Sequence, residues 1–210
     1  MAKGYWIPHL DVSNPDGFSP YRKMADAWHE HNGSRLLARA GRCELVEGKL
    51  RSRNVLREFP SFYAALAAYR SPEYSRARPL REPYSVCDFP IVEGYDGPQP
   101  PPIGTPPATG ALRGYWIGHV DVSDPEGYKA YQAANATAFG KFGARFLVRG
   151  GRQEVTEGRP RSRSVVLEFP SYEAALACYR SADYQAAAAR RKGKAVLDLI
   201  VIEAFDPSQH

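Results

Sequence analysis

The sequence predicts an α+β protein made of two ferredoxin-like domains. The first reason is an internal repeat: residues 4–93 and 114–203 are identical at 41 of 90 positions without a gap. Identity at that level and at one fixed offset indicates a tandem duplication. The second reason is that each copy has the strand and helix pattern βαββαβ, the ferredoxin-like arrangement.

A proline-rich segment separates the two copies. We place the first ferredoxin-like repeat at residues 1–94, the linker at 95–112 and the second repeat at 113–206. The linker contains six prolines and three glycines. Proline lacks the backbone N–H that helices and sheet ladders need, so this segment favours extended geometry.

The second copy shows the element order most clearly. Residues 114–122 alternate as a strand does, and Asp124 with Pro125 suits the start of a helix. Gly143 marks the end of that helix. The further strands are at 145–149, 163–169 and 195–203, with a second helix after Pro170-Ser171. Gly150-Gly151 makes a turn or bulge after the second strand, and residues 152–156 continue extended.

Two helices can cover only one face of a four-stranded sheet. The other face needs a partner to bury its apolar side chains, and duplication supplies one. The sequence therefore predicts an intrachain pseudo-dimer in which the two sheets pack against each other.

Composition narrows the possible classes of protein. Hydrophobic residues make up 43% and charged residues 24%, as in globular domains. The formal charge is +5, but its arginines alternate with glutamates, which disfavours nucleic-acid binding and favours a small anionic ligand. We also expect no membrane segment and no signal peptide. The three cysteines have no counterparts in the other copy, which argues against a disulfide framework or zinc site and for a cytoplasmic location.

The second copy also resembles a known family. It is similar to the domain of unknown function thirteen-thirty, within the dimeric α+β-barrel superfamily. The residues that carry the resemblance are GYWIxHxDVSDP (114–125), GARFLVRGGR (143–152), Glu157-Gly158, RSRSVVLEFPS (161–171), Cys178-Tyr-Arg-Ser181, Tyr184 and Ile202-Glu203. The resemblance implies the barrel fold but no reaction. The superfamily includes cofactor-independent monooxygenases, lactone isomerases, polyketide cyclases, haem-handling enzymes and ligand binders.

His9 and His119 are the candidate catalytic residues. Each lies in the first strand of its copy, and a histidine that titrates near neutral pH can act as a general base. The structural alternative is a buried histidine that hydrogen-bonds to the backbone or a carboxylate.

Arginine, glutamate and tyrosine side chains are the candidate substrate contacts. Guanidinium groups can hold a carboxylate or phosphate through paired hydrogen bonds, and tyrosine hydroxyls can line a pocket. The structural alternative is an Arg–Glu network that braces the sheet ends, with the tyrosines in the core. The candidates are Arg152, Arg163, Tyr179, Tyr184 and Glu154, with Arg42, Arg53, Tyr69 and Tyr74 in the first copy.

No motif for a nucleotide, a metal or a catalytic serine is present. His29 and His31 occur only in the first copy and do not share a helix face, although His29 alone could face a pocket. We therefore expect no cofactor and no metal. The favoured function is a small-molecule-binding protein, and further an enzyme of isomerase, cyclase or monooxygenase type acting on an acidic or aromatic substrate. The alternatives are a non-catalytic binding module and a structural protein.

Overall fold

The computed structural model describes residues 2–29, 31–110 and 112–209. The chain folds into two compact units, and each contains helices and an antiparallel sheet. The first unit is formed from residues up to 40, 51–95 and 151–160. The second is formed from residues 41–50, 96–150 and those from 161 on. The predicted α+β class is confirmed.

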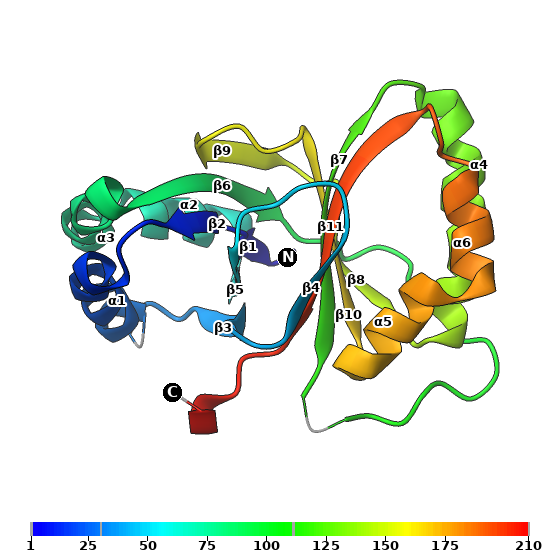
Figure 1. The fold of residues 1–210 in the computed structure, drawn as a ribbon, viewed down its shortest axis with the longest axis horizontal. Coiled ribbons are helices and arrows are strands. Elements are labelled where there is room, and N and C mark those ends of the chain that lie inside the picture. Colours follow the sequence, from blue (N-terminus) through cyan, green and yellow to red (C-terminus); the bar gives the residue numbers. More distant parts are fainter. Residues whose placement is uncertain (1, 30, 111, 210) are drawn as a thin grey trace. The chain divides into compact units, whose positions relative to one another are not determined.

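The second unit follows the predicted element order closely. Its sheet has the strand order β4-β11-β7-β10-β8, and four of these strands come from the second repeat. Figure 1 shows α4, α5 and α6 along one face of this sheet. The bounds are β7 (Gly114–Val122), α4 (Pro125–Lys141), β8 (Arg145–Arg149), β10 (Arg163–Phe169), α5 (Tyr172–Arg180), α6 (Ala182–Ala189) and β11 (Ala195–Glu203). The predicted second helix is two helices, because Ser181 has extended backbone geometry and caps the start of α6.

The first unit has the same plan with one interruption. Where the second repeat has the continuous strand β7, the first has β1 (Gly4–Trp6) and β2 (His9–Val12). Pro8 lies between them, and proline cannot donate a hydrogen bond to a neighbouring strand. Strands β5 and β6 pair with β1 and β2, and β3 pairs with β5.

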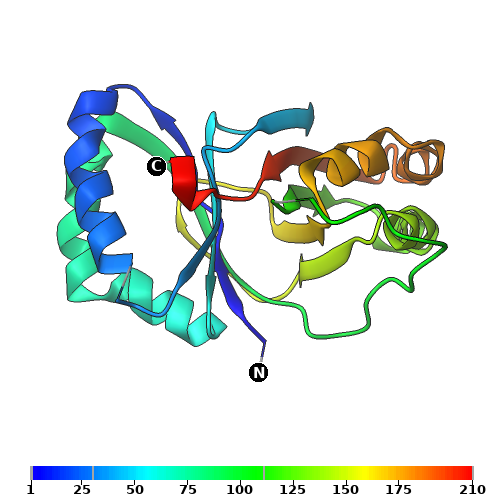
Figure 2. The same ribbon diagram turned by 90° about the horizontal axis from the view of Figure 1, so that it is seen from below.

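The helices of the first unit lie along one side of its sheet (Figure 2). The bounds are α1 (Pro15–His29), β3 (Arg35–Arg39), β5 (Arg53–Phe59), α2 (Phe62–Arg70), α3 (Pro72–Ala77) and β6 (Ser85–Glu93), with short 3₁₀ turns at Arg78–Leu80 and Glu82–Tyr84. A third such turn, Pro207–Gln209, lies near the C-terminus.

Each unit also takes one strand from the other repeat. Strand β4 (Cys43–Glu47) pairs with β11, and β9 (Gln153–Glu157) pairs with β6 (Figure 1). The tandem repeats thus form an intrachain pseudo-dimer joined by reciprocal strand exchange. The sequence indicated extended residues at 152–156 but not their partner strand. The expected packing of one sheet against the other stays a prediction, as do the repeat boundaries.

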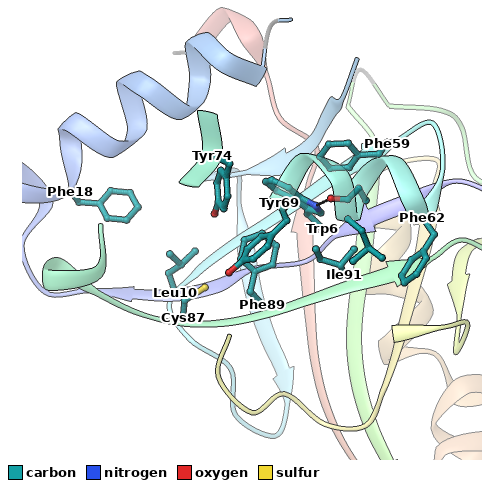
Figure 3. Packing of buried hydrophobic residues seen from close by; sticks show 12 residues of the cluster. Trp6, Leu10, Phe18, Phe59, Phe62, Tyr69, Tyr74, Cys87, Phe89 and Ile91 are labelled. Atoms are coloured by element: carbon teal, nitrogen blue, oxygen red, sulfur yellow. Dashed lines mark hydrogen bonds between the residues drawn. The ribbon is translucent and has the colours of Figure 1, made fainter. Parts of the chain in front are cut away.

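An aromatic cluster forms the core of the first unit (Figure 3). Trp6 is 3% exposed, and its indole N–H donates to the Ala65 carbonyl at 2.9 Å. Its ring packs against Phe59 and Phe89 at centroid separations of 4.9 and 5.1 Å. Trp116 makes the equivalent hydrogen bond to Ala175 at 3.0 Å. Both sheets are therefore fixed to their helices by a buried tryptophan.

The linker forms hydrogen bonds with a strand and a helix of the second unit. The Gln99 side chain accepts from the Phe146 amide at 2.7 Å, and the Ile103 amide donates to the Gly140 carbonyl at 3.1 Å. No helix in the described ranges combines the length and apolar character that crossing a membrane requires.

Candidate functional site

A cavity of about 50 Å³ lies between the sheet and helices of the second unit. We call it the second-unit cavity. Its walls are mainly apolar, with several aromatic side chains, which is typical of pockets that bind small molecules. They are formed by Trp116, Tyr128, Tyr131, Phe139, Phe146 and Tyr184, together with small and aliphatic residues of the sheet. The polar lining residues are Gln132, Asn135, Arg149 and Arg163.

Two tyrosine hydroxyls meet at one side of this cavity. The hydroxyl oxygens of Tyr131 and Tyr184 are 3.2 Å apart, and both side chains are buried. Burial raises the pKa of Tyr184 well above its ordinary value and that of Tyr128 to about 12. The hydroxyls of Tyr184 and Tyr128 therefore stay protonated at neutral pH and keep an O–H group that can donate a hydrogen bond.

A buried arginine close to the tyrosine pair forms an ion pair with a partly exposed glutamate. Arg191 is 6% exposed and donates to both carboxylate oxygens of Glu47 on β4, at 2.6 and 2.5 Å. Its guanidinium carbon lies 5.4 Å from the ring centre of Tyr131. The exchanged strand thus supplies the counter-charge next to the tyrosine pair. The first unit repeats this arrangement with Arg81, Glu157 of β9 and the hydroxyls of Tyr21 and Tyr74, which are 3.4 Å apart.

Arg163 is the cation best placed for an anionic ligand of the second-unit cavity. It begins β10, is partly exposed and passes over Gly150. It forms no ion pair with a carboxylate among the residues that the structure describes. A guanidinium in that state retains its capacity for a forked interaction with a carboxylate.

The equivalent cavity of the first unit has about 60 Å³ and a different lining. We call it the first-unit cavity. It lies between α1 and the sheet, and Trp6, Phe18, Tyr21 and Phe89 form its aromatic part. Five arginines and one carboxylate complete it: Arg22, Arg39, Arg53, Arg57, Arg81 and Asp26.

His29 is the histidine in the wall of the first-unit cavity. Its Nδ1 accepts a hydrogen bond from the Asn32 side-chain amide at 2.9 Å, which leaves the proton of the neutral ring on Nε2. Burial, with Arg57 and then Arg39 nearby, lowers the pKa of His29 to about 2. The imidazole is therefore neutral across the physiological pH range.

The candidate catalytic histidines lie on the opposite face of each sheet. In β7, Trp116, Gly118 and Val120 line the cavity, and side chains alternate along a strand, so His119 points to the other side. His119 is 1% exposed, with its Nδ1 2.9 Å from Ser164 Oγ. His9 is equally buried and lies 2.5 Å from Asn54 Oδ1. Neither histidine is among the residues that line the two described cavities, and their catalytic role stays a prediction.

The other candidates divide into cavity residues and residues that hold the exchanged strands. Arg163 and Tyr184 line the second-unit cavity, and Arg53 lines the first. Tyr74 joins the first through Tyr21.

The remaining candidates lie outside both cavities. Arg42 binds Glu203 and Glu173, while Glu154 pairs with Arg70. Arg152 donates to Tyr63 at 2.8 Å. The Tyr69 hydroxyl donates to Glu157 and the Tyr179 hydroxyl to the Val46 carbonyl, both at 2.8 Å. For these residues the geometry matches the bracing alternative.

Sequence reasoning missed several cavity residues. Tyr128 and Tyr131, both on α4, and Arg57 on β5 are not among the sequence-based candidates. One signal was available in the alignment of the two repeats. Arg57 aligns with Leu167, whereas four residues earlier in the same strand both repeats have an arginine, Arg53 and Arg163. A charge at a repeat position that is otherwise apolar indicates a difference in the site.

The family described as Domain of unknown function (DUF1330) matches residues 3–95 and again residues 113–205. The chain belongs to this family. No protein in a search of curated sequences matches significantly. The two matched segments confirm the tandem organisation and cover both cavities.

Solved structures with similar folds span almost the whole chain. One is titled anthrone oxidase-like protein: 13% identity, TM-score 0.55, covering 98% of this chain and 92% of that one. A candidate monooxygenase from Fusobacterium nucleatum has 10% identity and TM-score 0.54, covering 98% and 94%. A mutant chlorite dismutase from Candidatus Nitrospira defluvii has 6% identity and TM-score 0.50, covering 94% and 90%. At these identities the likeness establishes the fold alone.

Proposed function

We propose that the protein binds small acidic aromatic molecules in the second-unit cavity and acts on them without an organic cofactor. The proposed reaction class is isomerisation, cyclisation or oxygenation. The proposed location is the cytoplasm. The observation that carries the proposal is Arg163, a guanidinium without a carboxylate partner in the described chain, at the wall of a mainly apolar cavity that includes six aromatic side chains. Such a pocket matches a planar ring that carries one negative charge.

The binding mode follows from the distribution of polar groups. A ligand ring would pack against Trp116 and Phe139, which are themselves in edge contact at 5.7 Å. Its carboxylate would pair with Arg163, and a phenol or carbonyl oxygen would accept from Tyr184. At about 50 Å³ the cavity holds only part of such a ligand, so binding requires side-chain rearrangement at its mouth.

The tyrosine pair gives the cavity a chemical capability beyond binding. A protonated Tyr184 whose hydroxyl meets that of Tyr131 can stabilise negative charge that develops on a ligand oxygen. Enolates and phenolates of that kind are intermediates for all three reaction classes. Two proteins of similar fold are titled anthrone oxidase-like protein and candidate monooxygenase, and we therefore favour oxygenation among the three reaction classes.

The second candidate function is binding without turnover. It is favoured by the lining itself: Gln132, Asn135, Arg149 and Arg163 are its non-aromatic polar members, and none of them is a base at neutral pH. An enzyme would therefore need a base from outside this cavity. His119 is the sequence-based candidate.

The described cavities do not fit a haem. At about 50 and 60 Å³ they would have to open far more to admit a porphyrin than to admit a single aromatic ring. The Nδ1 of His29 is already a hydrogen-bond acceptor for the Asn32 amide.

Binding can be tested by thermal shift with benzoate and salicylate, with cyclohexanecarboxylate and benzyl alcohol as controls for ring and charge. A ligand at one hundred times its Kd stabilises the protein by about 2.7 kcal/mol. We expect R163Q to abolish the shift with salicylate, and R145Q, which removes an exposed arginine outside the cavity, to leave it unchanged. Equal shifts in the two variants would refute the site.

Turnover is tested separately. Candidate aromatic acids that bind are followed by absorbance and oxygen consumption with the wild-type protein, H119A and Y184F. Loss of turnover in H119A with binding retained supports a base at His119. Binding without turnover of any bound acid favours the non-catalytic alternative.

A further inference from the structure

The two cavities occupy equivalent places but differ in charge. Three positions that line both cavities carry arginine or histidine in the first unit and a neutral residue in the second. They are Arg22 against Gln132, His29 against Phe139 and Arg57 against Leu167. The shared lining residues are Trp6 with Trp116, Tyr21 with Tyr131, Arg39 with Arg149 and Arg53 with Arg163. The two repeats therefore share part of the cavity lining but differ in the charge of the other lining side chains.

Arg57 makes the largest difference in buried charge between the two cavities. It lies in the middle of β5, is 7% exposed and lines the cavity. It donates to Ser34 Oγ at 3.0 Å and has no carboxylate within 4 Å in the described part of the chain. An uncompensated buried cation is costly to the folded state. Burial, then repulsion from Arg39, lowers the pKa of Arg57 to about 10, so the group is still charged at pH 7.

Arg53 is a second cation of this cavity that no neighbouring carboxylate neutralises. Asp26 neutralises Arg39, to which it binds at 2.5 Å, and Glu157 neutralises Arg81. Arg53 is half-buried, and its guanidinium carbon lies 5.6 Å from the ring centre of Phe18. No described carboxylate pairs with Arg53 either.

His29 adds a neutral donor to this wall. Because its Nδ1 accepts from Asn32, the cavity-lining imidazole carries its proton on Nε2. Arg22, exposed on α1, adds a further positive charge at the rim. Cations, a neutral N–H donor and no unpaired acid together form the lining that an oxyanion needs.

We propose that the first-unit cavity binds a small dianion whose charge is carried on oxygen atoms, held between Arg57 and Arg53. The two guanidinium groups that are buried or half-buried and pair with no described carboxylate match two negative charges. This site is separate from the aromatic-acid site proposed for the second unit, and the tests of the two use different variants. Sulfate, phosphate and succinate are suitable probes, and their order of affinity distinguishes a tetrahedral oxyanion from a dicarboxylate.

The twin repeat supplies the test variant. R57L installs the residue that occupies the same position in the second unit, where it packs with 3% exposure. Binding of each probe is measured by calorimetry at constant ionic strength, with acetate and chloride as single-charge controls. We expect saturable binding of at least one dianion to the wild-type protein and at least a tenfold weaker affinity in R57L. R163Q, in the other unit, should bind the dianion as the wild-type protein does.

Stability provides the second readout. Without a dianion, R57L should have a Tm at least equal to that of the wild-type protein, because it removes a buried unpaired charge. Sulfate stabilises most proteins non-specifically, so its effect is compared between variants at equal concentration. R53Q serves if R57L does not fold. Absence of dianion binding, equal binding in R57L or R53Q, or equal loss in R163Q would overturn the proposal.

Discussion

Gly48 offers a sharp test of how the exchanged strand β4 is held. It follows β4 with φ of +70°, a conformation that side chains with a Cβ rarely adopt. A Cβ there would lie 2.1 Å from Asp198 Oδ1 and 2.5 Å from the Leu197 carbonyl oxygen. The next residue, Lys49, donates its amide to the same Asp198 oxygen at 2.9 Å. Alanine at position 48 must therefore displace the turn from β11.

The magnitude follows from two contributions. The left-handed conformation costs alanine about 1–2 kcal/mol, and loss of a hydrogen bond to a charged group costs about 1.5–3 kcal/mol. We expect G48A to lower the free energy of unfolding of the second unit by about 2.5–5 kcal/mol when both contributions apply.

Gly193 is a matched control in the same unit. Its φ is +73°, but nothing lies within 4 Å of the place where a Cβ would be. G193A should therefore cost only about 1–2 kcal/mol. Urea unfolding at pH 7, followed by circular dichroism, measures both variants. If G48A and G193A are destabilised equally, the contact with Asp198 does not hold the exchanged strand and the reasoning fails.

Three further predictions concern single groups. Y184F removes one hydroxyl of a buried pair and should lower the free energy of unfolding by about 1 kcal/mol in urea; no change would show that the pair contributes nothing. The backbone N–H of Ser162 donates to Asp121 and lowers its pKa, so this stabilisation is present above the unfolded pKa of about 3.9 and is lost as pH falls through the folded value. D121N should therefore flatten the Tm-against-pH curve on the acid side, and an unchanged curve would contradict this. Exposed Cys43 should react with Ellman's reagent in the native protein, whereas Cys178, whose thiol pKa is raised by burial, should react only after unfolding; early reaction of both would contradict the burial.

The sequence by itself determined the duplication, the element order and the fold class. These depend on local signals: the repeat, the N-cap at Asp124 with Pro125, and the alternation of strand residues. Each signal acts over a few residues and is therefore readable without the fold. The family assignment rests on the same motifs and is confirmed over both copies.

Tertiary structure alone decided which residues share a cavity. Residues 114–120 of β7 are all buried, so alternation separates Trp116 from His119 without telling which side faces the helices. The sequence also did not show that β4 pairs with β11 and β9 with β6. Strands pair through backbone N–H and C=O groups, which nearly every residue has, so the side chains do not name the partner strand. Arg57 became a candidate ligand contact only because the fold places no described carboxylate within ion-pair distance of it.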